Sequence, residues 1–505
     1  MNRNRESTPV RWITTLAACA LALAALANAS SARAGTLMVT TLNDTGPGSL
    51  RQAIADASPG DTITFSVKGT ITLTSGALMI DKSLDIEGPG PNKLKISGNN
   101  ASRVFVIASG TVTMAGVTIS NGLADGDAPI FASTGGGILN LASLTLSNDV
   151  VSDNQALGDR SQSPLGCAGG GFGGGGGNFG TLAITDSSFS GNVARGGDGS
   201  NGPFAPGIGF GGAILSMGSA SVTESEFTNN VARGGNGCTG PSAGTGHGGG
   251  AIANYGGSLT IAASTFSHNQ SIGGNGNSGD GSGFASSGAL FTMGSLELRD
   301  SQFDHNQAVG GSNNSGVGPS SALGGAIHGY FSGVTTIDGC TVTHNEARGG
   351  AGGPGVDGGS GAGGGIDAEY GADVTVSNCA VEHNKALGGP GGPGGNGGIG
   401  AGGGLRSGDG ATLIVISTTV AHNHAQGGEG RAGGKGGDGW GGGFIDFLAT
   451  LTLTGATVTD NLALGGGPGG QGIGGGVYNN GIYSADPTTV IDKNHATTSN
   501  DNIWP

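Results

Sequence analysis

A column of histidines offers the clearest chance of chemistry in this sequence. Five histidines recur at intervals of 37 to 39 residues, and each stands directly before an asparagine of a repeated motif. If the repeats are rungs of a parallel sheet, the imidazoles lie about 4.8 Å apart. At that spacing they could share Zn²⁺ or Ni²⁺, or respond together to pH. The alternative is a stacked polar column produced by duplication, with no chemical role. The metal candidates are His268, His305, His344, His383 and His422.

A pair of carboxylates is the second candidate, because cleavage of a polysaccharide commonly needs one. Asp304 and Glu382 share an outward-facing position two repeats apart, which separates them by about 9.6 Å at the strand spacing. That is just outside the ~6.5–9.5 Å range of inverting glycosidases. Gly246-His247-Gly248 is similar to part of a polygalacturonase signature, but the accompanying aspartate and Arg-Ile-Lys motifs are missing. We therefore assign no catalytic residue.

The repeated motif sets the spacing of both candidates. An apolar residue is followed three positions later by asparagine, and two positions after that by a small residue, ten times along the chain. Eight of the nine intervals are 37 to 39 residues and the last is 33. A fixed period of this length indicates a solenoid of stacked units. We expect the asparagines to form a buried, hydrogen-bonded ladder at a corner of each unit. They are Asn154, Asn192, Asn230, Asn269, Asn306, Asn345, Asn384, Asn423, Asn461 and Asn494.

Short alternating segments lie between these asparagines. Ala220 to Thr223, for example, alternates apolar and polar residues, as a half-buried strand does. Strands of three to five residues between glycine and asparagine corners predict an all-β fold. It is a single-stranded right-handed parallel β-helix with an N-terminal cap and glycine-rich loop insertions. Four phenylalanines are expected to stack inside it before valine takes over their position: Phe189, Phe227, Phe266 and Phe303.

The chain divides into four parts. Residues 1–34 are typical of a secretory signal peptide, with basic residues first, then an apolar run, then Ala-Arg-Ala. Residues 35–60 are predicted to form an N-terminal cap, in which a helix from Ser49 to Ala57 covers the open end of the β-helix. Residues 61–133 form short coils, and residues 134–505 form the repeats with glycine-rich loops.

Charge and composition limit the partners. Removal of residues 1–34 leaves 16 basic and 34 acidic side chains, a formal net charge of −18. This excess argues against nucleic acid, whose binding depends on Lys and Arg. After the leader, no segment has the ~20 apolar residues that span a bilayer. We expect a monomer without a cofactor, secreted or held at the outer surface of a bacterium.

Glycine-rich loops separate the repeats, and their lengths hardly vary. The interval from the first loop glycine to the next Gly-Gly-Ala-Ile-like block is 14 or 15 residues in eight loops. A flexible loop should drift in length, because doubling it costs only about 0.6 kcal/mol. Ordered polyglycine-II or polyproline-II arms, packed side by side, would explain the constancy. Such arms are similar to the bundles of springtail antifreeze proteins and phage adhesin tips. Flexible low-complexity sequence is the alternative.

Two cysteines occupy equivalent positions in neighbouring repeats. Cys340 and Cys379 each stand five residues before a repeat asparagine, where other repeats have serine. Stacked on adjacent coils, their Cα atoms would lie about 4.8 Å apart, within disulfide range. A disulfide and a pair of free, buried thiols both fit the sequence.

Two kinds of segment recur together in a way that resembles a known family. Gly-Gly-Ala-Ile at 211–214 precedes the asparagine motif at 227–230, and the same pair recurs at 249–252 and 266–269. A third pair, at 324–327 and 342–345, has valine in place of phenylalanine. The pattern is similar to the repeats of chlamydial polymorphic outer membrane proteins and, more broadly, to pectate-lyase-like β-helices. The resemblance implies a β-helix, a surface location and adhesion.

Together these features favour a scaffold over an enzyme. The leading interpretation is a secreted or cell-surface protein, adhesin-like or structural, that binds polysaccharide or extracellular matrix along its length. The alternative is an extracellular polysaccharide lyase, hydrolase or epimerase. Clustered, non-repeating charged residues on two or three adjacent coils would favour the enzyme, whereas unbroken columns favour the scaffold. The sequence shows mostly columns.

Overall fold

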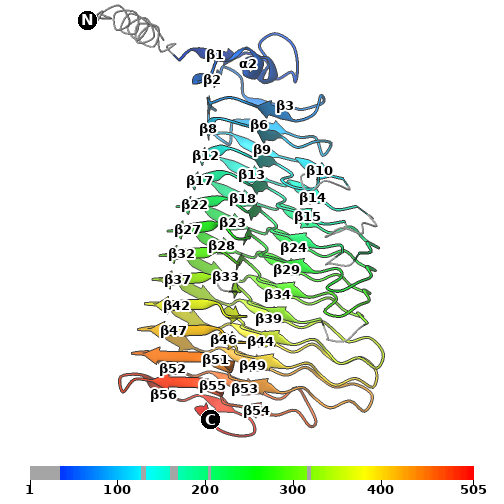
Figure 1. Cartoon of the computed structure of the whole chain (residues 1–505), viewed down its shortest axis with the longest axis vertical. Helices are drawn as coiled ribbons and strands as arrows, with labels where there is room; N and C mark the ends of the chain where they lie inside the picture. Colours follow the sequence, from blue (N-terminus) through cyan, green and yellow to red (C-terminus); the bar gives the residue numbers. More distant parts are fainter. Residues whose placement is uncertain (1–33, 127–131, 160–168, 203–205, 316–319, 332) are drawn as a thin grey trace, which may run out of the picture.

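The chain is a tall stack of coils (Figure 1). The computed structural model describes residues 34–126, 132–159, 169–202, 206–315, 320–331 and 333–505. Its strands form four sheets, of 25, 13, 11 and 9 strands, in which each coil pairs in parallel with the next. The fold is therefore the predicted right-handed parallel β-helix. All but the last residue of the predicted signal peptide lies outside the described residues.

One coil shows how the sheets are built. Its strands are, in chain order, β20 (Gly209–Phe210), β21 (Ile214–Ser216), β22 (Ser219–Thr223), β23 (Glu226–Thr228) and β24 (Val231–Arg233). β20 belongs to the 9-stranded sheet, β21 and β22 to the 25-stranded sheet, β23 to the 13-stranded sheet and β24 to the 11-stranded sheet. Side chains alternate between the two faces of a strand. Val222 and Phe227 therefore lie in the core while their neighbours face outward.

Two buried columns hold the coils in register. The rings of Phe189, Phe227, Phe266 and Phe303 stack with centroids 4.9, 4.8 and 4.7 Å apart. All ten repeat asparagines are buried, and Asn345 is typical of them. Its N–H and its Nδ2 both donate to Oδ1 of Asn384 at 3.0 Å. Its own Oδ1 accepts in the same way from Asn306, at 2.9 and 3.0 Å. The amides therefore satisfy one another from coil to coil.

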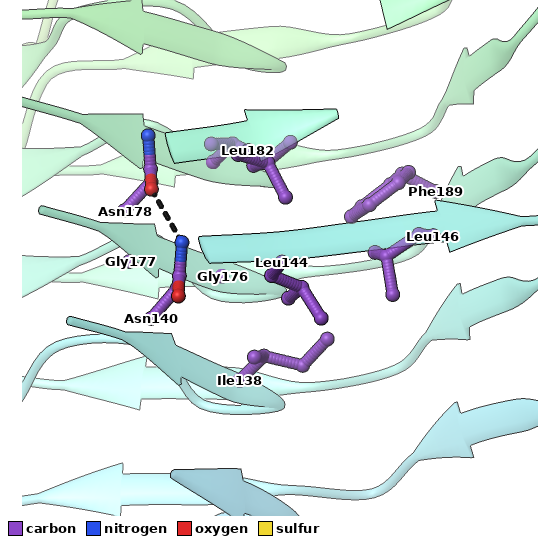
Figure 2. Close-up of a pocket in the computed structure, with 10 residues that line it drawn as sticks. Ile138, Asn140, Leu144, Leu146, Gly176, Gly177, Asn178, Leu182 and Phe189 are labelled. Carbon is purple, nitrogen blue, oxygen red and sulfur yellow. Dashed lines mark hydrogen bonds between the residues drawn. The ribbon is translucent and has the colours of Figure 1, made fainter. Parts of the chain in front are cut away.

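The interior contains a small void next to a glycine, shown in Figure 2. Gly176 lies in register between Ile138 and Ile214, whose side chains fill the core of the coils on either side. A void of ≈ 10 Å³ lies next to this glycine. At the rim of the same region, Nδ2 of Asn140 donates to Oδ1 of Asn178 at 2.8 Å (Figure 2). A second polar ladder thus runs along the bend between the two strands that each coil contributes to the 25-stranded sheet.

A short helix lies at the N-terminal end of the stack (Figure 1). The helix α2 (Leu50–Asp56) begins after Ser49, whose side chain accepts a hydrogen bond from the N–H of Gln52. Leu50 and Ile54 turn into the core. The region expected to be a cap also contains β1 (Thr36–Val39), which pairs with β2 (Asp61–Phe65) and so starts the sheet. No helix among the described residues is long and apolar enough to cross a membrane.

The glycine-rich loops form ordered arms over the described residues. Hydrogen bonds zigzag between the outgoing and returning halves of successive arms: the N–H of Gly359 donates to Gly350, Gly389 to Gly359, and Gly398 to Gly389, at 2.7 to 2.8 Å. A Cβ atom on Gly389 would lie 2.1 Å from the carbonyl oxygen of Gly350, so a side chain would push the arms apart. Glycine is needed here because the backbones touch. The interpretation as flexible linkers is therefore wrong for these arms.

Cys340 and Cys379 are free and buried. The N–H of Cys340 donates to Sγ of Cys379 at 3.3 Å, and the Oγ of serine accepts the equivalent bond in earlier coils, for example from Ser225 to Ser264. The thiols thus stand in for hydroxyl groups in a buried polar column. Of the two alternatives left by the sequence, the structure has the free pair.

Candidate functional site

A groove of ≈ 600 Å³ runs along the outside of the β-helix. It lies where the 9-stranded sheet folds against the outer face of the 25-stranded sheet, because side chains of both sheets line it. Pockets of this size with apolar walls and a few polar groups are the usual places for ligands. The lining residues are Phe172, Ile208, Phe210, Leu215, Met217, Ser242, Thr245, His247, Tyr255, Gly281, Phe284, Met293, Leu323, Tyr330, Phe331, Glu369 and Tyr370.

One column of side chains packs beneath this groove, where Leu215 lines it, and we call it the outer column. Each coil contributes two strands to the 25-stranded sheet, and the first of them begins with an inward-facing residue. The outer column consists of the residue that follows it in each coil. The strands include β21, β26 (Ile252–Asn254), β31 (Leu290–Thr292), β36 (Ile327–Tyr330), β41 (Ile366–Glu369), β46 (Leu405–Gly408) and β51 (Phe444–Thr454). In register, the outer column reads Leu215, Ala253, Phe291, His328, Asp367, Arg406 and Ile445. It is therefore apolar at both ends and has polar or charged residues at His328, Asp367 and Arg406.

Aromatic side chains form the apolar half of the groove. The Phe210 ring stacks on His247 with centroids 5.3 Å apart, and His247 meets the edge of Phe291 at 4.8 Å. Further along, Tyr330 packs edge to face against Tyr370 at 5.1 Å. Contacts of this kind fix the rings in place.

The rim of the groove remains open to solvent. Tyr255, Phe331 and Tyr370 are 46, 49 and 48% exposed. Large aromatic residues clustered on a soluble surface commonly mark a binding site.

Four titratable side chains lie together at the other end of the groove, which Glu369 lines; His328, Asp367 and Glu369 are buried and Arg406 is partly buried. Nη1 of Arg406 is 3.1 Å from Oδ1 of Asp367, and Nη2 is 2.9 Å from Oε1 of Glu369. Nε2 of His328 is 3.2 Å from Oδ2 of Asp367 and 3.6 Å from Oε2 of Glu369. Its Nδ1 is 2.7 Å from Oγ of Ser286. We call His328, Asp367, Glu369 and Arg406 the charged cluster.

Opposite charges lie in contact within the charged cluster. Burial opposes ionisation of Glu369, but the His328 imidazole and the Arg406 charge lower the pKa of Glu369 to about 2. Burial raises the pKa of Asp367 against the pull of Arg406. The two carboxylates raise the pKa of Arg406 despite its burial. The Arg406 guanidinium and the Glu369 carboxylate therefore stabilise each other's charge.

The charged cluster fits a metal ion poorly. His328, Asp367 and Glu369 have ligand atoms within 4.8 Å of one another. The guanidinium of Arg406 already occupies an oxygen of each carboxylate. A divalent ion would add its charge next to that guanidinium, which is unfavourable in a buried site.

Ser286, His328 and Asp367 are connected in the manner of a hydrolase triad, but they are not placed to act as one. All three side chains are fully buried, so a polymer could not reach Oγ of Ser286. The groups that do face the groove are poorly tuned for proton transfer near neutral pH. Burial raises the pKa of Tyr330 to about 12, and burial together with the nearby His328 lowers the pKa of His247 to about 3. General acid–base catalysis works best when the pKa lies near the working pH.

The residues singled out in the sequence lie elsewhere. The repeat asparagines and phenylalanines are inside the coils, and the five histidines stack outside at a corner, with centroids 4.9 to 5.2 Å apart. Asp304 and Glu382 lie in one column of the 13-stranded sheet with Thr343 between them in register. None of these lines the groove.

Of the sequence motifs, only His247 reaches the groove. The outer column was missed, although comparison of the residue after each Gly-Gly-Ala-Ile-like tetrapeptide would show polar and charged side chains at His328, Asp367 and Arg406.

Comparison with known proteins assigns no family to this chain. No protein-family model matches this chain, and no curated protein matches it. Among solved structures, a PL6 alginate lyase in complex with a trisaccharide aligns over 84% of this chain and 86% of its own length. The sequence identity is 11% and the TM-score is 0.25. A similarity this weak carries no argument about activity, so the fold assignment rests on the parallel strand pairing. The resemblance to chlamydial repeats stays a prediction.

Proposed function

We propose that this chain is a non-enzymatic, glycan-binding β-helix and that the outer groove holds a polysaccharide chain. The observation that carries the proposal is the open row of aromatic rings at Tyr255, Phe331 and Tyr370 above a preformed apolar wall. Sugar rings present faces of C–H groups, which pack well on aromatic faces. A groove along a stack of equal coils also suits a ligand made of repeating units.

The ligand that fits best is a neutral glycan. The acidic group among the lining residues is Glu369, and Arg406 pairs with it. A uronic acid polymer would bring further negative charge to a chain with 35 acidic and 20 basic side chains. Like charges of that kind oppose association.

A polysaccharide-cleaving enzyme is the second candidate. The observation in its favour is the charged cluster itself, which places non-repeating charged residues on three adjacent coils. Its burial and the pKa values at the groove weigh against catalysis. Binding is therefore the better-supported role.

The test is to incubate the purified mature protein with neutral and acidic polysaccharides and to follow retention and cleavage together. We expect retention of at least one neutral glycan without new chain ends. Two variants should each weaken binding about tenfold, or about 1.4 kcal/mol: Tyr255→Ala, and Tyr370→Asn. Asparagine suits the second site because Tyr370 has φ 52 and asparagine tolerates that conformation. Met79→Ala removes an exposed apolar side chain outside the groove and is the matched control. Cleavage of any glycan would contradict the proposal.

Secretion and an adhesin-like surface role are part of the same proposal. They are supported by the leader at residues 1–34 and by the resemblance of the repeats. Expression with the leader, followed by N-terminal sequencing of extracellular material, should give a chain that begins at Gly35. A chain that keeps its N-terminus and stays in the cell would contradict this part alone.

A further inference from the structure

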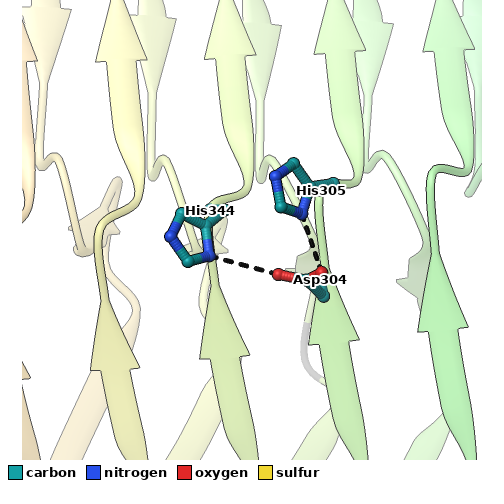
Figure 3. Close-up of side chains that lie close together, drawn as sticks. All are labelled: Asp304, His305 and His344. Carbon is teal, nitrogen blue, oxygen red and sulfur yellow. Dashed lines mark hydrogen bonds and ion pairs between the residues drawn. The ribbon is translucent and has the colours of Figure 1, made fainter.

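A second group of side chains, on the exposed histidine column, has the arrangement of a metal site. Asp304 ends β33 (Gln302–Asp304), and His305 follows it at the corner. Nδ1 of His305 is 2.7 Å from Oδ2 of Asp304. Nδ1 of His344, from the next coil, is 3.2 Å from Oδ1 of the same carboxylate. Figure 3 shows the two rings directing these nitrogens at one aspartate.

We propose that Asp304, His305 and His344 bind one divalent transition-metal ion of the Zn²⁺ class. Their ligand atoms all lie within 4.8 Å of one another. A small movement of the side chains would therefore place one ion between them, at the ~2.0–2.2 Å of Zn–N and Zn–O bonds from each ligand atom. Two imidazole nitrogens and one carboxylate oxygen are ligands that zinc commonly takes, and copper and nickel accept them too.

The backbone holds these ligands ready. His305 and His344 have φ 54 and 56, which fixes them at tight corners, and each is followed by a ladder asparagine bonded to the coils on both sides. Oγ1 of Thr343 donates to Oδ1 of Asp304 at 3.1 Å, which orients the carboxylate. Support of this kind from outside the ligand set is typical of metal sites.

The site is also open. The side chains of His305, His344 and Asp304 are 51, 49 and 39% exposed, so water can complete the coordination. The charged cluster in the groove differs in the feature that matters most, because there Arg406 supplies the positive charge that a metal would bring. At Asp304 the partners in contact include two imidazoles, and a neutral imidazole nitrogen can bind a metal.

The experiment is equilibrium dialysis of the mature chain, without a histidine tag, against Zn²⁺, with Co²⁺ absorption spectra as a second readout. We expect one ion per chain. Asp304→Asn and His344→Asn should each weaken binding by roughly 100-fold or more, beyond the loss typical of a supporting residue. Asparagine already occupies the corner position at Asn229 with φ 55, so the His344→Asn chain should fold.

The control is His422→Asn, which changes the same column but lies outside the group of Asp304, His305 and His344. It should leave the affinity unchanged. Absence of Zn²⁺ uptake would overturn the proposal. An equal loss of affinity in His422→Asn and His344→Asn would overturn it too, because the ion would then belong to the column as a whole.

Discussion

Two adjacent columns of this β-helix obey different rules. The ladder asparagines are invariant over ten coils and buried, whereas the position just before them varies and is exposed at the histidines. All residues at that second position share a positive φ, between 54 and 63. They are Asp153, Gly191, Asn229, His268, His305, His344, His383, His422, Asp460 and Lys493. Glycine, asparagine, aspartate and histidine are the residues that most readily adopt this conformation.

The comparison separates what the fold demands from what it merely permits. The buried column must satisfy hydrogen bonds on both sides, and only asparagine does so at this corner. The exposed column must only tolerate the backbone, so its side chains are free to acquire chemistry. This explains how a row of histidines can arise without function, and why one carboxylate beside it at Asp304 is enough to suggest a site.

The largest effect should come from breaking the buried column. Asn345→Ala removes the acceptor for two donors of Asn306 and the donor to the carbonyl oxygen of Phe303. Buried groups left without partners cost about 1–3 kcal/mol each, so we expect the free energy of unfolding to fall by about 3–4 kcal/mol. His344→Asn, one position away, should change it by less than about 0.5 kcal/mol. Urea titrations followed by circular dichroism compare the two, and equal losses would refute the distinction between the columns.

A second buried polar column offers a test by pH. Asp149 occupies the position that holds Ser187 in the next coil. Burial raises its pKa to about 7, although the N–H groups of Val117 and Ser147 favour the carboxylate. Because the folded pKa lies above the unfolded value of 3.8, the folded state holds the proton more tightly. Its stabilising contribution is complete below about pH 4 and is lost as pH rises through 7, a change of roughly 2–4 kcal/mol.

The Asp149→Ser variant isolates this contribution from other titrating groups. The difference in unfolding free energy between the variant and the parent chain, measured at pH 4 and pH 8, should shift in favour of the variant at pH 8. A constant difference would mean that Asp149 is ionised in the folded chain throughout this range.

A smaller effect tests the exposed column. His383 has φ 57 and an exposed side chain. Replacement by valine puts a β-branched residue into a left-handed conformation, which should cost about 1–2 kcal/mol. Replacement by asparagine should be nearly neutral. Thermal unfolding of the two variants gives the comparison, and a valine variant as stable as the asparagine variant would show that the corner relaxes.

The sequence predicted the columns because their spacing is periodic. A repeat of 37 to 39 residues fixes which side chains stack, and the histidine centroids lie 4.9 to 5.2 Å apart, close to the spacing expected between strands. The helix after Ser49 followed from its cap and its apolar face. Periodicity therefore carried the prediction wherever one position performs one task in every coil.

The outer column escaped prediction because its chemistry does not repeat. Phe291, His328, Asp367 and Arg406 occupy one column but differ on every coil. Their burial depends on the 9-stranded sheet, which is built from the glycine-rich loops. The sequence did not settle whether those loops are ordered. Nothing in it therefore marked these positions as covered by another sheet.

The smallest expected effect comes from Gly176, where a column of inward-facing isoleucines is interrupted by glycine. Gly176 stands between Ile138 and Ile214, and a Cβ atom built on it would meet only the carbonyl oxygen of Ile138, at 3.8 Å. Gly176→Ala should therefore raise the unfolding free energy by about 0.5–1 kcal/mol, since alanine loses less backbone entropy on folding. Gly175→Ala is the matched control, because its Cβ would lie 2.9 Å from the carbonyl oxygen of Ala213. The control should lose stability in the same urea titration. If both variants lost stability, a methyl group would not fit the ≈ 10 Å³ void. The interior would then tolerate substitution at this glycine as poorly as at the ladder asparagines.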